Sequence, residues 1–137
     1  MKKKLPIALI GAFLAGNATA ACKQSDARGT WITYQAAFIT ASGGQHVGEC
    51  RLKVNRDGSL TKEESNNGGS YCEFVTFNTG HIPTEGTFTL NRNCSATISL
   101  SIGLEAQAQV SANKQMYAGR FTAQGGSVSG TTTAVRQ

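Results

Sequence analysis

Apolar and polar residues alternate along most of residues 21–137, which is the pattern of β-strands with one face turned to a core. The alternation is strict in 95–101, where Ala96, Ile98 and Leu100 are separated by serine and threonine. Glycine, asparagine and aspartate separate such segments at turns. The pattern predicts nine strands, at 30–40, 47–54, 59–64, 70–78, 86–91, 95–101, 104–111, 115–123 and 127–135.

Short connections between these segments predict a single all-β domain over residues 21–137, with antiparallel strands in up-and-down order. A flat sheet of this size would expose two edges, so closure into an eight-stranded barrel is favoured. Two packed sheets in a sandwich are the alternative. Alanine and glutamine in 104–111 also permit a helix, but the alternation across seven residues favours a strand.

The first residues have the pattern of a secretory signal peptide. Three lysines, Lys2 to Lys4, precede the apolar run 5–14, and Ala18-Thr19-Ala20 supplies the small residues of a cleavage site. We expect residues 1–20 to be removed after Ala20, which predicts a periplasmic or secreted protein, of bacterial type, without a transmembrane span. Lipid attachment at Cys22 is the competing interpretation, disfavoured because Thr19 replaces the usual large aliphatic residue.

Four cysteines remain in the predicted mature chain: Cys22, Cys50, Cys72 and Cys94. An even number after an export signal predicts two disulfides, with three possible pairings. The short connection between Cys50 and Cys72 favours that pair, and Cys22 with Cys94 would then tie the N-terminus to the barrel wall. No two cysteines have the close spacing of a zinc site, so neither a metal nor another cofactor is expected.

Charge excludes one large class of partners. The formal charge of +5 includes Lys2, Lys3 and Lys4; without them ten basic residues face eight acidic ones, which leaves +2. No basic patch results, so nucleic acid is not an expected partner. We expect a monomer.

No motif for catalysis stands out. His46 and His81 both fall in predicted loops, and the two aspartates of the chain are Asp26 and Asp57, near the N-terminus and in a turn. Phosphate-binding loops and nucleophile motifs are missing from the sequence. We therefore expect a non-catalytic protein.

Aromatic residues on the predicted strands are candidates for a filled core or for the lining of a ligand site. Glu73 shares an expected strand face with Tyr71 and Phe77, and small residues around Ala108 would leave interior space. The predicted ligand-binding residues are Trp31, Tyr71, Glu73, Phe77, Ala108, Tyr117 and Arg120.

The residues Gly29-Thr30-Trp31 on the first strand resemble the signature of the lipocalin and avidin-like calycin group. The resemblance implies a lipocalin-like barrel in which Trp31 closes one end, packed against a basic residue of a late strand. Arg120 and Arg136 are the candidates for that residue. It also implies a small apolar or amphipathic ligand inside the barrel.

A second resemblance joins Gly29-x-Trp31 with Cys50-Arg51-Leu52 and Cys72. This combination is similar to small periplasmic barrel inhibitors of secreted bacterial metalloproteases, which plug the enzyme with an N-terminal trunk. It implies the alternative function of a protein-binding module, with a secreted protease as partner. The residues before Gly29 would then form the contact surface.

Overall fold

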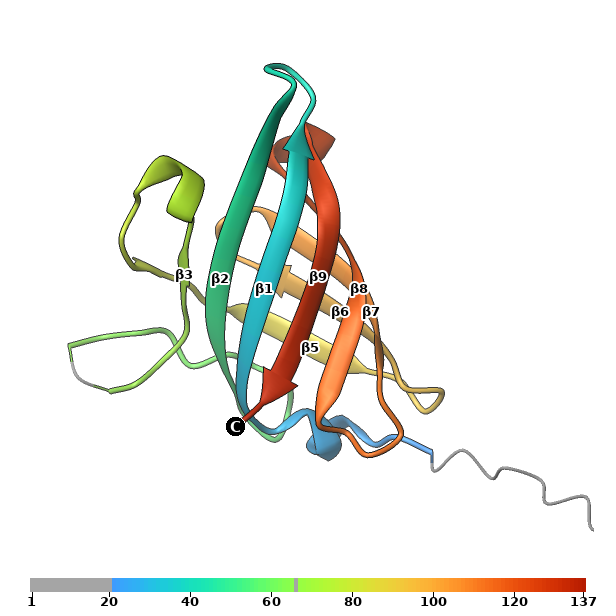
Figure 1. Cartoon of the computed structure of the whole chain (residues 1–137). Helices are drawn as coiled ribbons and strands as arrows, with labels where there is room; N and C mark the ends of the chain where they lie inside the picture. Colours follow the sequence, from blue (N-terminus) through green and yellow to red (C-terminus); the bar gives the residue numbers. More distant parts are fainter. Residues whose placement is uncertain (1–20, 66) are drawn as a thin grey trace, which may run out of the picture.

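The protein forms one antiparallel sheet of nine strands that curls into a half-barrel (Figure 1). A computed structural model describes residues 21–65 and 67–137; the predicted signal peptide, 1–20, lies outside the described residues. The sheet order is β4-β3-β2-β1-β9-β8-β7-β6-β5. No helix within the described ranges has the length and apolar character needed to cross a membrane.

Short 3₁₀ turns accompany the strands at Gln24–Ala27 (η1), Val75–Phe77 (η2) and Gln124–Gly126 (η3). The strands are β1 Gly29–Ile39, β2 Gly44–Val54, β3 Tyr71–Glu73, β4 Ile82–Pro83, β5 Gly86–Leu90, β6 Ser95–Leu100, β7 Leu104–Val110, β8 Met116–Ala123 and β9 Val128–Arg136. Seven of these agree with predicted segments within a few residues. The alternation of burial in β7 confirms that this Ala/Gln-rich segment is a strand.

Two glycines let the sheet bend around its core. A Cβ atom at Gly119 would lie 2.6 Å from the Cα of Ala108, and one at Gly130 would lie 2.5 Å from the Cα of Ala37. Both distances are shorter than carbon atoms tolerate, so only glycine allows the neighbouring strands to approach so closely. Because Gly119 and Gly130 lie on β8 and β9, both close approaches fall in the middle of the sheet.

The expected eight-stranded closed barrel does not form, because the predicted strand 59–64 is not a strand. Ser59 makes a single bridge to Thr87, and Leu60 makes one to Val54. Asp57 turns the chain just before it, accepting hydrogen bonds from the backbone and hydroxyl of Ser59. Residues 59 and 60 therefore connect the end of β2 to the edge strand β5 by isolated bridges rather than by a continuous ladder.

The predicted strand 70–78 also ends early, after Glu73. The Phe74 amide donates to Oγ1 of Thr79 at 3.0 Å, and Asn78 adopts a left-handed conformation with φ of 48°. These local bonds turn the chain into η2 instead of continuing the strand. In consequence Tyr71, Glu73 and Phe77 do not share one strand face, and Pro83, expected in a loop, lies on the short edge strand β4.

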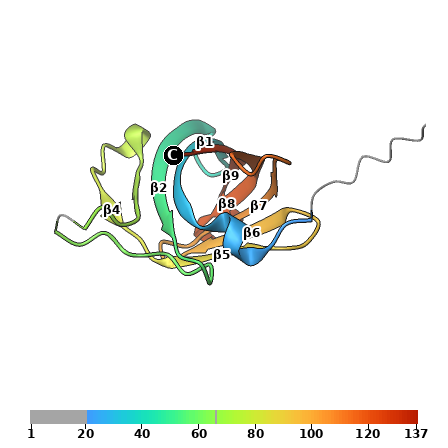
Figure 2. The ribbon, with the colours of Figure 1, turned by 90° about the horizontal axis from the view of Figure 1, so that it is seen from below.

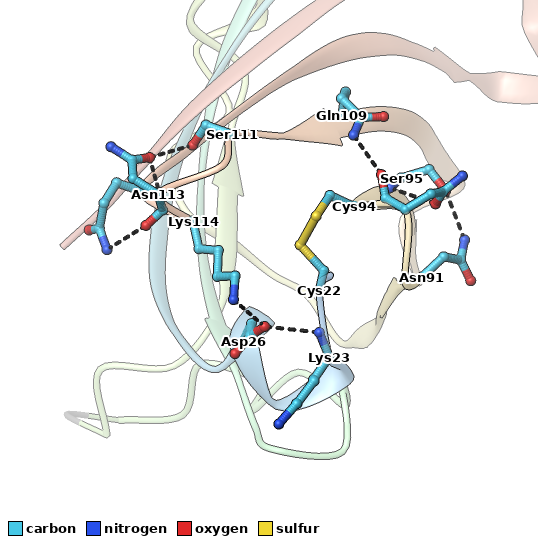
Figure 3. Close-up of a disulfide and its surroundings, with 12 residues drawn as sticks. Cys22, Lys23, Asp26, Asn91, Cys94, Ser95, Gln109, Ser111, Asn113 and Lys114 are labelled. Atoms are coloured by element: carbon cyan, nitrogen blue, oxygen red, sulfur yellow. Dashed lines mark hydrogen bonds and ion pairs between the residues drawn. A yellow bond between two sulfur atoms is a disulfide. The ribbon is translucent and has the colours of Figure 1, made fainter. Parts of the chain in front are cut away.

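Both disulfides have the preferred pairing, Cys22–Cys94 and Cys50–Cys72. Cys50 and Cys72 are direct neighbours on β2 and β3, so their bond fixes the register of that pair. Cys22 and Cys94 connect the segment before β1 to the turn before β6 (Figure 3).

One end of the half-barrel is closed by η1, which lies across the ring of strands in Figure 2. Beneath it Trp31 is fully buried, donates from Nε1 to the Ala27 carbonyl at 2.8 Å, and packs on Phe88 and Tyr117. The Arg136 guanidinium lies 5.9 Å from the centre of the Trp31 ring. Of the two candidates, Arg136 and not Arg120 is therefore the basic residue against Trp31.

Backbone carbonyls and an ion pair hold η1 in this position. Arg136 donates to the carbonyls of Asp26, at 3.0 Å, and of Arg28. The Asp26 carboxylate accepts from Nζ of Lys114 at 2.8 Å and from the Lys23 amide (Figure 3). The hydrogen bond from Lys114 is the main reason why the pKa of Asp26 is lowered. We call this end, with η1 and Trp31, the closed end.

Candidate functional site: an apolar pocket at the open end

The opposite end of the half-barrel, where the β1–β2 hairpin and η3 lie (Figure 1), holds a pocket of about 310 Å³. We call it the open end. This volume is at the lower limit of pockets that bind small molecules. The pocket is lined by His46, Phe74, Phe77, Thr79, Ile82, Ile102, Leu104, Phe121, Ala123, Gln124 and Val128.

The alternation of the strands places most of these side chains. Inward positions near strand ends carry His46 on β2, Leu104 on β7, Phe121 on β8 and Val128 on β9. In an up-and-down sheet these four ends meet at the same side of the molecule. Four segments far apart in the sequence thereby build one apolar wall.

A short segment after β3 covers the β2 side of the pocket. The rings of Phe74 and Phe77 lie 5.1 and 5.3 Å from the His46 ring, centre to centre. Thr76 holds the segment on β2, because its Oγ1 accepts a hydrogen bond from the Val47 amide at 2.8 Å. Phe77 remains 53% exposed, so part of this cover presents apolar surface to solvent.

His46 is the one titratable side chain among the residues that line the pocket. It was expected in a loop, but it lies on β2 and is only 4% exposed, since β2 begins three residues earlier than predicted. Burial lowers the pKa of His46 below its ordinary value. The imidazole is therefore neutral near pH 7.

A layer of buried polar side chains separates the pocket from the aromatic cluster of the closed end. Thr33 and Gln35 on β1 and Thr132 on β9 point inward and are almost fully buried. Burial raises the pKa of the Tyr117 phenol, against the opposing effect of the Thr132 and Thr33 hydroxyls. Tyr117 therefore stays protonated at any physiological pH.

Of the predicted ligand-binding residues, Phe77 alone lines this pocket. Trp31 and Tyr117 lie in the aromatic cluster of the closed end, and Ala108 belongs to the buried core of β7. The remaining three, Tyr71, Glu73 and Arg120, lie on the outer side of the half-barrel.

Tyr71 and Glu73 are on the outer side of β3, where Tyr71 stacks on His81 with ring centres 3.6 Å apart. The Glu73 side chain is 44% exposed and lies 4.0 Å from the His81 ring, so it faces the outer surface of the sheet and not the interior. Arg120 lines a wider and more polar hollow of about 580 Å³ on the outer face of β7 to β9.

Sequence reasoning did not single out the pocket residues His46, Leu104, Ala123 and Val128. A signal for three of them was present, since each occupies an inward position next to a predicted turn at the same end of the sheet. His46 gave no such signal, because the strand that carries it was predicted to begin at residue 47.

Fold and pocket together define a disulfide-linked, all-β half-barrel with one sealed end and one apolar, open end. Comparison with protein-family models and with curated proteins finds no match to this chain. Within residues 21–65 and 67–137, no three side chains of His, Cys, Asp or Glu come together in a way that could hold a metal ion. The geometry of the open end is therefore the basis for the function proposed below.

Proposed function

We propose that the protein is a non-catalytic carrier that binds one small apolar or amphipathic ligand in the pocket of the open end. The observation that carries the proposal is the pocket itself, because eight of its eleven lining residues are aliphatic or aromatic. Transfer of apolar ligand surface from water into such a pocket supplies the affinity. The protein acts as a monomer, since one half-barrel contains the complete pocket.

The closed end supports this proposal because it leaves one entrance. Trp31, Phe88 and Tyr117 fill the opposite end, and η1 covers them. A ligand would thus enter and leave at the open end. A carrier of this kind fits the periplasm or the exterior of a bacterium, a location with which two disulfides are compatible.

The alternative, a protease inhibitor with an N-terminal trunk, is supported less well. Its contact surface would be the residues before Gly29, but Cys22 is bonded to Cys94 and Ala27 is fully buried. Asp26 and Arg28 accept hydrogen bonds from Arg136. A segment held in this way cannot extend into an enzyme cleft without opening the closed end.

Binding of an uncharged fluorescent dye, N-phenylnaphthylamine, tests the carrier proposal. We expect one saturable site, and we expect Ala123→Phe to weaken it by about tenfold or more, since Ala123 lines the pocket and a phenyl ring would fill it. Ala118→Phe is the matched control: it places the same ring on the exposed face of the same strand. Absence of dye binding by the native protein, or equal binding by both variants, would contradict the proposal.

A further inference from the structure

The open end differs from the rest of the surface in having no charged residue. Four segments form it, 37–47, 74–84, 100–104 and 121–130, and none contains aspartate, glutamate, lysine or arginine. Two carboxylates that flank these segments in the sequence are directed away from the pocket. Glu73 lies beside His81 on the outer side of β3, and Glu105 accepts a hydrogen bond from the Ser99 hydroxyl on the outer face of β7.

Two polar atoms under this uncharged end lack hydrogen-bond partners among the described residues. They are Oε1 of Gln35 and Nδ1 of His46, and both residues are 96% buried, with 4% of their surface exposed. Buried polar atoms are nearly always paired, and leaving one unpaired is energetically unfavourable. An unpaired atom beside a pocket is therefore a ready partner for a bound molecule.

Of the two residues, His46 lines the pocket, and Gln35 lies behind the lining residues. His46 lies between Phe74 and Phe77. Gln35 pairs with Gly48 across β1 and β2; a Cβ atom built on Gly48 would lie 3.1 Å from Oε1 of Gln35 and 2.9 Å from the Phe74 ring. The Gln35 oxygen and the covering ring of Phe74 therefore both lie next to Gly48.

These groups are suited to a hydroxyl and not to an ion. The Gln35 oxygen accepts a hydrogen bond, and a neutral imidazole either donates or accepts one at Nδ1, so a hydroxyl that does both can satisfy them. A carboxylate would enter without any cation to pair with it, and a quaternary ammonium without any anion. Burial of an unpaired charge is far more unfavourable than burial of a hydroxyl with partners.

We infer that the pocket selects an uncharged amphiphile, such as a long-chain alcohol, whose hydroxyl group bonds to Gln35 and His46 while its chain lies against the apolar wall. This inference rests on the proposed function and specifies its ligand class. It differs from the usual expectation for an apolar carrier, because it excludes fatty-acid anions as the preferred ligands.

Displacement of bound N-phenylnaphthylamine at pH 7.5 tests the inference with three ligands of equal chain length. We expect decanol to displace the dye at a concentration at least about tenfold lower than decanoate or decyltrimethylammonium. Equal potency of decanol and decanoate, or a preference for either ion, would overturn the inference while the carrier function stands. If the dye itself does not bind, the proposed function fails and the inference fails with it.

Two pairs of variants locate the cause of the preference. Gln124 lies on the pocket rim and Gln124→Lys supplies the missing cation, so we expect decanoate to bind about tenfold more tightly, with Gln124→Met as the uncharged control. Gln35→Leu removes one hydrogen-bond partner, so decanol should bind about fivefold or more less tightly with dye binding retained. An unchanged decanol affinity in Gln35→Leu, together with no gain for decanoate in Gln124→Lys, would also overturn the inference.

Discussion

The two ends of the half-barrel are built from the same strands but have opposite chemistry. At the closed end the polar groups that hold η1 are paired: Trp31 donates to Ala27, Arg136 to two carbonyls, and Lys114 to Asp26. At the open end no residue is charged, and buried polar atoms of Gln35 and His46 are unpaired. On the proposed function, the closed end provides most of the stability and the open end binds the ligand.

Such a division has a physical reason. A single domain of this size has limited stability, so a region with unsatisfied polar atoms and exposed aromatic rings must be supported by another region that is fully packed. A disulfide and an ion pair lie at the closed end (Figure 3), together with the aromatic cluster around Trp31. Substitutions there should reduce stability, and substitutions at the open end should alter binding.

The largest expected effect is that of Trp31→Ala. Trp31 is fully buried against Phe88 and Tyr117, and its loss leaves a large cavity under η1. We expect the free energy of unfolding to fall by about 3–5 kcal/mol, as measured by urea denaturation followed by far-UV circular dichroism.

Phe77→Ala is the control at the open end, because its ring is half exposed. We expect it to change the free energy of unfolding by less than about 1 kcal/mol while weakening dye binding. Similar losses of stability in both variants would show that the two ends are not divided as described.

The strands of the half-barrel were the part of the fold most accessible to sequence reasoning. In β6 and β7 the alternation of apolar and polar residues matches the alternation of burial position by position. The same rule failed at 70–78, where Tyr71, Glu73, Val75 and Phe77 continue the alternation through a 3₁₀ turn. Periodicity records only which side chains are apolar, whereas the bond from Phe74 to Thr79 ends the strand.

The closed end was also partly predictable, because the Gly29-Thr30-Trp31 motif drew attention to Trp31 and to Arg136. The position of the pocket could not be predicted, because it depends on which end of the sheet is covered. That outcome is set by η1 and by the disulfide between Cys22 and Cys94, which bring distant segments together. The expected space near Ala108 is instead occupied by core packing.

Removal of each of the two disulfides should affect dye binding differently. Cys22→Ser with Cys94→Ser opens the link that holds η1, and we expect the free energy of unfolding to fall by about 2–4 kcal/mol in urea titrations. Dye binding should persist under native conditions, because the pocket is at the other end. Cys50→Ser with Cys72→Ser should weaken dye binding as well, since Cys72 precedes the covering segment with Phe74 and Phe77. A larger loss of binding in the first pair would contradict this assignment.

The smallest expected effect is a dependence of stability on pH that comes from the open end. Burial lowers the pKa of His46 in the folded protein, whereas the unfolded chain has the ordinary value of 6.5. Below that pH the unfolded state therefore binds more protons than the folded state, so His46 lowers the free energy of unfolding as the pH falls. Above pH 6.5 it has little effect on the free energy of unfolding.

The groups packed on the His46 ring are Phe74 and Phe77, with Ala37 opposite it on β1, and none of them titrates. Asp26 at the closed end has a pKa lowered from 3.8, so it does not contribute between pH 5 and 7.5. We expect His46→Leu to flatten the decrease in thermal stability between these pH values. His81→Ala, in which an exposed histidine is removed, should retain the part of the decrease that His46 causes. If the decrease were unchanged in His46→Leu and lost in His81→Ala, the sensitivity to pH would belong to the outer surface of β3 and β4, and the open end would have no part in it.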